Sequence, residues 1–222
     1  MAHDHAKDKK AASACPPRVA RVLGAQYRAA VVDPHPHLLA LVDEADVRVW
    51  YYLVAGLGAP FEHGEYIFRL TAPDSFPQRP PRLEFCTANG VFEPGGPVCL
   101  SVGEFHADDR PGQDGAHGWR PSLGMRGFAA QVVNGLICHE GLSGIRILST
   151  PPAIKTARAR ASREANRREH PGLYARFEAL AAARPAAAPA RELLAARARL
   201  APPAPDTPAP DTPAAGMSLA PP

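Results

Sequence analysis

The sequence predicts an α+β domain in which one helix precedes four consecutive strands and three helices follow them. Apolar residues recur at helical spacing near the start of the chain and again after residue 121. Between these regions, short alternating or β-branched runs separated by turns fill residues 37–86. Strands joined by short turns form an antiparallel meander, because neighbouring parallel strands need long crossover connections.

The first predicted helix covers residues 17–31, with Val19, Leu23 and Tyr27 on one face. It ends before Asp33-Pro34, because the residue before a proline avoids the helical conformation. Strands follow, separated by polar or glycine-containing turns. They are predicted at residues 37–43, 47–54, 65–71 and 82–86.

Regular patterning stops at residues 87–121, which form a glycine-rich loop. A long loop inside a compact domain is uncommon and usually carries function. Helices are predicted to return after it, with Ser122 as the N-cap of the first and Pro171 in the first turn of the last. Their predicted ranges are 122–139, 153–169 and 171–182.

The 222 residues suit one domain with tails. The last 42 residues contain 10 Pro and 16 Ala and few large side chains. Such a segment buries too little apolar surface to offset its ordering entropy. We therefore expect a disordered N-terminus at 1–14, a core domain at 15–182 and an Ala/Pro-rich disordered tail at 183–222.

Composition argues against several protein classes. No apolar run approaches the roughly 20 residues of a membrane helix, and the first ten residues are too polar for a secretory signal. Four scattered cysteines do not suit a disulfide scaffold. We therefore expect a soluble protein of the cytoplasm or nucleus with reduced thiols. Cys86 and Cys138 are expected in the core, and Cys15 is expected to be exposed ahead of the fold.

Positive charge is concentrated toward the C-terminus, where residues 153–200 hold 11 Lys/Arg and four Asp/Glu. Such a region can contact nucleic acid or an acidic protein surface. Because no motif that reads a nucleic-acid groove accompanies it, a solvated Arg-rich helix face is the preferred interpretation and nucleic acid is an unlikely partner.

Thiol chemistry is the best interpretation of the loop at 87–121. It contains Cys99 together with Asn89, His106 and an acidic group around Asp108 and Asp109. A thiolate is a good nucleophile and a good acyl carrier. A side-chain amide such as that of Asn89 can donate a hydrogen bond to the oxyanion that forms when an amine attacks a thioester. An ordinary Asn-Gly turn is the alternative for this residue.

Four segments resemble the ubiquitin-conjugating enzymes. Residues 76–81 look like the family's aromatic-Pro-x-x-Pro-Pro link before the fourth strand. Residues 87–92 (Thr-Ala-Asn-Gly-Val-Phe) are similar to the Thr-Pro-Asn-Gly-x-Phe motif of the branch that acts in endoplasmic-reticulum protein degradation. Residues 99–106 and 119–122 look like that branch's Cys-Leu-Ser-x-x-(Asp/Glu)-Phe-His and Trp-x-Pro-Ala motifs.

This resemblance, which covers about residues 17–180, implies the ubiquitin-conjugating fold and its activity. Cys99 would accept ubiquitin as a thioester from an activating enzyme and pass it to a substrate lysine or to a ligase. The implied partners are ubiquitin, the activating enzyme, a ubiquitin ligase and a protein substrate, and the chain itself needs no cofactor. Ligase contacts carry over to residues 18–27, to Ser75 and Phe76, and to Pro121 and Ser122.

The resemblance also implies roles for other loop residues. Asn89 matches the asparagine that stabilises the oxyanion or orders the loop. Asp108 or Asp109 would orient the incoming amine. His106 is interpreted as an anchor of the loop in preference to a proton shuttle, and Trp119 and Phe92 as packing residues.

Some features depart from the family pattern. Ala88 replaces the proline of the Thr-Pro-Asn motif, which could loosen the turn, and residues 106–118 contain an insertion. Ser122 replaces an alanine in the ligase-facing loop. The C-terminal membrane anchor usual in the branch is absent from the sequence, so location at that membrane is not expected.

Other interpretations remain open. The chain could be a catalytically inactive relative that binds ubiquitin or a ligase, although such variants typically lose the cysteine. An unrelated scaffold protein is disfavoured by the joint order of the motifs. A thiol hydrolase lacks a third orienting group, and a zinc site lacks paired Cys or His ligands at the usual spacing.

Overall fold

The computed structural model describes residues 14–98, 100, 103, 118–140, 142 and 144–183. Apart from residues 14 and 183, both predicted tails lie outside these ranges. The predicted α+β order is confirmed, with one helix, four strands and then three helices. The elements are α1 (Pro17–Val32), β1 (Leu38–Val42), β2 (Val49–Ala55), β3 (Glu65–Thr71), β4 (Arg82–Phe85), α2 (Gly124–Ile137), α3 (Pro152–Glu169) and α4 (Pro171–Ala183).

The four strands form one antiparallel sheet in the order β1-β2-β3-β4. In this register, Tyr52 of β2 lies between Ala40 of β1 and Phe68 of β3. The rings of Tyr52 and Phe68 stack with centroids 5.1 Å apart. Cross-strand aromatic pairs of this kind stabilise the register, because a shift of one strand by one residue would turn its ring to the opposite face and separate the pair. The predicted meander is therefore confirmed.

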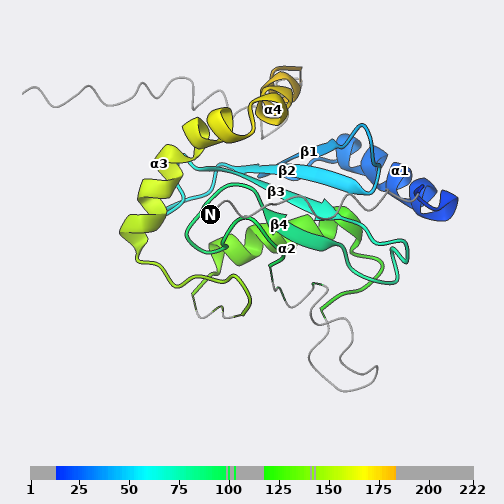
Figure 1. Ribbon diagram of the computed structural model, residues 1–222, viewed down its shortest axis with the longest axis horizontal. Helices are drawn as coiled ribbons and strands as arrows, with labels where there is room; N and C mark the ends of the chain where they lie inside the picture. Colours follow the sequence, from blue (N-terminus) through cyan, green and yellow to red (C-terminus); the bar gives the residue numbers. More distant parts are fainter. Residues whose placement is uncertain are drawn as a thin grey trace, which may run out of the picture.

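The main hydrophobic core lies on the sheet face covered by α1 and α2 (Figure 1). Alternate residues of the strands point into this core, among them Trp50 and Phe68. Val19 and Leu23 enter it from α1. Phe128 and Leu136 are among the residues that α2 contributes. The expected apolar faces of both helices are thus buried.

The opposite face of the sheet carries a smaller hydrophobic cluster covered by α4. Leu39, Leu53 and Ile67 come from three neighbouring strands, and Tyr174 and Phe177 come from α4. Because both faces of the sheet are covered, β3 is buried along most of its length, and its sequence loses the clean apolar-polar alternation of a half-exposed strand.

The helix α3 packs through a face that is largely polar. Its buried residues are Lys155, Ala159, Ser162 and Asn166. Ser162 and Asn166 contact the first residue of β3, so α3 lies across the end of the sheet where that strand begins. No helix within the described ranges is long and apolar enough to cross a membrane.

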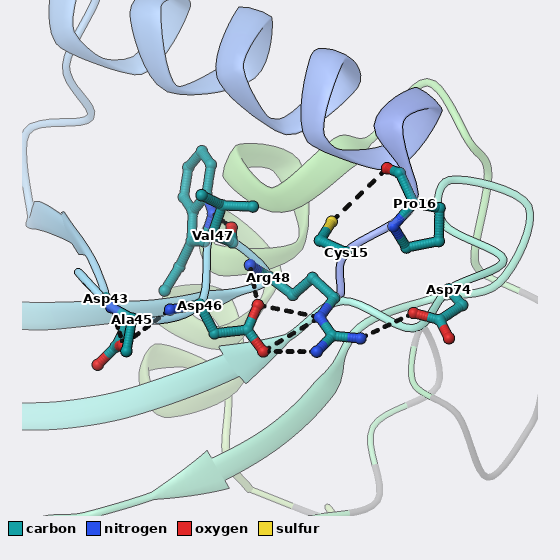
Figure 2. A network of polar contacts seen from close by, with 9 residues as sticks. Cys15, Pro16, Asp43, Ala45, Asp46, Val47, Arg48 and Asp74 are labelled. Atoms are coloured by element: carbon teal, nitrogen blue, oxygen red, sulfur yellow. Dashed lines mark hydrogen bonds and ion pairs between the residues drawn. The ribbon is translucent and has the colours of Figure 1, made fainter. Parts of the chain in front are cut away.

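The turn between β1 and β2 is fixed by Arg48 (Figure 2). Its guanidinium contacts the Asp46 carboxylate at 2.7 Å and that of Asp74 at 2.8 Å. Beside this pair, Cys15 is half-buried against the main core and its thiol donates to the carbonyl of Pro16. Burial raises the pKa of the Cys15 thiol. The expectation of an exposed Cys15 was therefore wrong, because residues just before α1 already pack on the domain.

Two further local expectations are corrected. Leu123, not Ser122, is the N-cap of α2, and no side chain of that segment caps the helix. The Gln26 side chain of α1 instead accepts a hydrogen bond from the backbone N–H of Met125 at 2.9 Å. Cys138 is exposed rather than in the core, because it follows the last turn of α2. A helix cap supplied from another element leaves no local sequence signal.

Candidate active site

The structure describes only part of the predicted site. Asn89 is described and is completely buried. Cys99, His106, Asp108 and Asp109 lie outside the described residues, so their predicted roles stay predictions.

Residues immediately before position 99 run along the open edge of β4. The N–H of Gly95 donates to the carbonyl of Phe85 at 3.2 Å, and that of Val98 donates to Leu83 at 2.9 Å. Glu84 and Pro97 form an isolated antiparallel bridge between these contacts. Because this segment pairs with β4 at these points, it leaves less of the β4 edge unpaired.

Asn89 closes the turn that precedes this segment. Its side-chain oxygen accepts the backbone N–H groups of Val91 and Phe92 at 2.9 and 2.7 Å. Its amide nitrogen donates to the carbonyl of Thr87 at 3.3 Å. An amide group has two N–H donors, and the second forms no hydrogen bond to another residue that the structure describes. The residue therefore orders the turn even with Ala88 in place of the proline.

Three neighbours hold the turn from the other side. The Thr150 hydroxyl donates to the carbonyl of Gly90 at 2.6 Å. The N–H of Leu148 donates to the carbonyl of Val91 at 2.7 Å. Lys155 packs against Gly90 and is buried. The turn is thus enclosed by the segment that leads into α3, far from it in the sequence.

Arg146 is a site neighbour that sequence reasoning missed. Its backbone has φ 60°, an uncommon conformation for a residue other than glycine. Its guanidinium contacts Glu93 at 3.2 Å and donates to the carbonyl of Pro94 at 3.0 Å. The same group lies against Gly96, where a Cβ would come within 2.6 Å of it. Nothing local in the sequence signals these contacts, because about fifty residues separate the partners.

Cys86 lies just before the turn but is a poor nucleophile. Burial raises the pKa of its thiol to about 11, so the thiolate is scarce near neutral pH. The predicted structural role of this residue fits its packing against the smaller cluster. Within the described ranges, no group of three or more His, Cys, Asp or Glu residues could hold a metal ion.

Comparison with known proteins identifies the family. The family profile described as "Ubiquitin-conjugating enzyme" matches residues 25–137, about half of the chain. The chain belongs to the ubiquitin-conjugating enzyme family. The matched range includes the Asn89 turn, position 99 and all of α2.

Individual relatives are more distant. The protein named "Ubiquitin-conjugating enzyme E2 6" from Debaryomyces hansenii is 28% identical over 158 residues, covering 71% of this chain and 61% of the relative. "Ubiquitin-conjugating enzyme E2 J1" of Homo sapiens is 30% identical over 149 residues, covering 67% of this chain and 43% of the relative. The chain thus spans less than two thirds of these relatives. A solved human "Ubiquitin-conjugating enzyme E2 G1" aligns with a TM-score of 0.46 at 24% identity, covering 56% of this chain and 98% of that one.

In this family member, the three segments expected to contact a ligase come together. Arg18 of α1 donates to the side chain of Gln78 in the proline-rich link at 3.3 Å. The Trp119 indole donates to the carbonyl of Pro77 at 3.1 Å. Pro121 and Ser122 follow and are exposed, whereas the side chain of Phe76 is completely buried against the main core. Any ligase contact at the link therefore falls to the neighbours of Phe76. Trp119 and Phe92 pack as predicted.

Proposed function

We propose that the chain is an active ubiquitin-conjugating enzyme that carries ubiquitin as a thioester on Cys99. The supporting observation is the family match over residues 25–137, which spans both Cys99 and the Asn89 turn. The buried, hydrogen-bonded geometry of Asn89 adds support, because it would provide a preorganised amide donor in the turn that precedes the segment leading to position 99.

The proposed reaction has two acyl transfers. The thiolate of Cys99 attacks the thioester carbonyl of ubiquitin on the activating enzyme and expels the enzyme's thiolate. An amine of the substrate, or a ligase thiol, then attacks the new thioester, loses a proton and expels the Cys99 thiolate. In each step the carbonyl oxygen gains negative charge, which the second N–H of Asn89 would stabilise. We further propose that Asp108 or Asp109 orients the amine and that His106 anchors the loop.

The proposed partners are ubiquitin, the activating enzyme, a ligase and a protein substrate, and no cofactor is required of this chain. We propose that the ligase docks where the start of α1, the proline-rich link and Pro121-Ser122 meet. Contacts between Arg18 and Gln78 and between Trp119 and Pro77 support one continuous surface there. The cytoplasmic or nuclear location stays a prediction.

Thioester formation tests the function directly. Incubation with activating enzyme, ATP and ubiquitin should give an adduct on a non-reducing gel that disappears with thiol. Cys99→Ala should abolish it, whereas Cys138→Ala should not, because Cys138 is an exposed residue after α2. If the folded protein forms no adduct, the chain is not an active conjugating enzyme.

The role of Asn89 needs two variants, because its oxygen orders the turn and its nitrogen is the proposed donor. Asn89→Asp keeps an oxygen for the N–H groups of Val91 and Phe92 but removes the donor. We expect it to charge normally and to discharge to free lysine about 10²–10³-fold more slowly. Asn89→Ala should show the same slow discharge together with a lower Tm. Unchanged discharge in Asn89→Asp would leave the residue with the turn-ordering role alone.

A further inference from the structure

We propose that Thr87 and Asn166 are positioning residues for Asn89, so that helix α3 sets the orientation of the amide used in ubiquitin transfer. This inference rests on the proposed function. Its basis is a chain of hydrogen bonds from α3 through Thr87 to Asn89, all between buried groups.

Hydrogen bonds hold both the backbone and the side chain of Thr87. Its N–H donates to the carbonyl of Ile67 at 3.2 Å, and its hydroxyl oxygen accepts the N–H of Ile67 at 2.9 Å. The hydroxyl proton goes to the side-chain oxygen of Asn166. A threonine hydroxyl has only one proton, so this contact fixes its rotation. The carbonyl of Thr87, which accepts from Asn89, is fixed by the same contacts.

Asn166 is itself oriented by the sheet. Its side-chain nitrogen donates to the carbonyl of Glu65 at 2.9 Å, which leaves its oxygen facing Thr87. A flip that exchanged the oxygen and the nitrogen of this amide would lose both hydrogen bonds. Because the residue is almost completely inaccessible to water, an unmade bond here costs more than at the surface.

The buried face of α3 contains more polar residues than packing alone requires. A helix that only covers the sheet would bury apolar residues, which need no partners and pack at lower cost. Thr150, just before α3, and Lys155 in its first turns enclose Gly90, whereas Asn166 reaches Thr87. Both ends of this segment therefore meet the turn that Asn89 closes, on opposite sides of that residue.

Fixing Thr87 also fixes which way the Asn89 amide points. The amide oxygen must face the N–H groups of Val91 and Phe92, and one N–H must face the carbonyl of Thr87. The second N–H then has one direction only. If the carbonyl shifts, this donor shifts with it, and small displacements of a catalytic donor slow transfer strongly.

Ser162 provides a matched control on the same helix face. Its hydroxyl oxygen accepts the N–H of Glu65 at 2.9 Å and its proton goes to the carbonyl of Ala159. It is as buried as Asn166 and anchors α3 to the same strand residue. None of its described hydrogen bonds reaches Thr87 or Asn89. Its removal should weaken the α3 contact without turning the amide.

The experiment compares charging and discharge in Thr87→Val, Asn166→Ala and Ser162→Ala. We expect the first two to slow discharge to lysine about 10-fold or more, with charging within about twofold. All three variants should lower the Tm by similar amounts, but Ser162→Ala should discharge normally. Thr87→Ser keeps the hydroxyl and should restore discharge. In an Asn89→Ala background, Thr87→Val should have no further effect on discharge.

Equal slowing in Ser162→Ala, or normal discharge in Thr87→Val, would overturn the inference and leave α3 with a structural role. A second readout does not depend on transfer. The NMR cross-peaks of the Asn89 side-chain NH₂ should shift in Thr87→Val and Asn166→Ala but not in Ser162→Ala, and unchanged peaks in all three would also overturn it. A missing Cys99 adduct would instead contradict the proposed function, with the NMR comparison still deciding the positioning role.

Discussion

At the scale of single residues, both the backbone conformation and the surrounding space restrict which residue can follow Asn89 in the Asn89-Gly90 turn. Gly90 has φ +89°, a region that L side chains rarely adopt. A Cβ at this position would lie 2.9 Å from the Thr150 hydroxyl and 3.0 Å from the Cγ of Lys155. The turn therefore depends on glycine for two separable reasons.

Gly95 separates these reasons, because it has φ +85° and no neighbouring atom lies within 4 Å of the place where a Cβ would be. We expect Gly95→Ala to lower the free energy of unfolding by about 1–2 kcal/mol, the cost of the left-handed backbone alone. Gly90→Ala should cost at least about 1 kcal/mol more, since Thr150 and Lys155 must move. Urea unfolding monitored by tryptophan fluorescence measures both. Equal losses would mean that the enclosure of Gly90 is loose.

At the scale of elements, the β1–β2 turn shows how a charge pair fixes a connection. Arg48 is mostly buried and contacts Asp46 through two of its nitrogens, while the third reaches Asp74 beyond β3 (Figure 2). Bidentate pairs of this kind are stronger than single exposed ones. Hydrogen bonds from Arg48 lower the pKa of the Asp46 carboxyl below its usual range.

A pH dependence follows from that lowered pKa. The folded state favours the ionised carboxylate, so its stabilisation is complete above the ordinary pKa of about 4 and is lost as pH falls through the lower folded value. Asp46→Asn should therefore cost about 1–2 kcal/mol at pH 7 and less below about pH 4. Urea unfolding at pH 7 and pH 3 measures this difference.

Asp33 offers the control for this prediction, because it forms an exposed ion pair with Arg126 in which the nitrogen and oxygen lie 2.8 Å apart. Asp33→Asn should change the free energy of unfolding by less than about 1 kcal/mol at pH 7. If the loss of unfolding free energy in Asp46→Asn is as large at low pH as at pH 7, the shape of the Asp46 side chain and not its charge explains the loss.

At the scale of the whole molecule, segments about a hundred residues apart form the proposed ligase surface. The buried ring of Phe76 packs near Trp119 and Trp119 packs near Phe128, with centroids 6.1 Å apart in each pair. These contacts join the proline-rich link to α2 and hold the exposed Pro121 and Ser122 beside them. The main core thus determines the geometry of a surface that distant segments of the chain form together.

Ser122→Arg tests this surface. With a ligase that accelerates discharge of the unaltered protein, we expect the accelerated component to fall about 10-fold, which corresponds to roughly 1.4 kcal/mol of binding. Discharge without ligase should stay unchanged. Ala161→Arg adds the same charge at an exposed position of α3 and should have no effect on either rate. Equal effects of the two variants would place the ligase elsewhere.

Most of the fold was predictable because its elements are defined by local patterns. The β3 bounds agree with the predicted 65–71, and the helices differ from their predicted ends by at most two residues. Failures came where tertiary packing or the exact end of a helix decides the outcome. Gln26 caps α2 in place of Ser122, and Cys138 falls just past the last buried turn of the helix.

The sequence by itself determined the order of the elements, the family resemblance and the choice of Asn89 and Cys99 as candidate site residues, because hydrophobic periodicity and short motifs are local properties of the chain. Only the tertiary structure decided how Asn89 is oriented. Its partners reach it through Thr87 from Asn166, 79 residues beyond that threonine, and through Gly90 from Thr150. Hydrogen bonds between residues so far apart depend on how α3 packs against β3, and no spacing in the sequence records that packing.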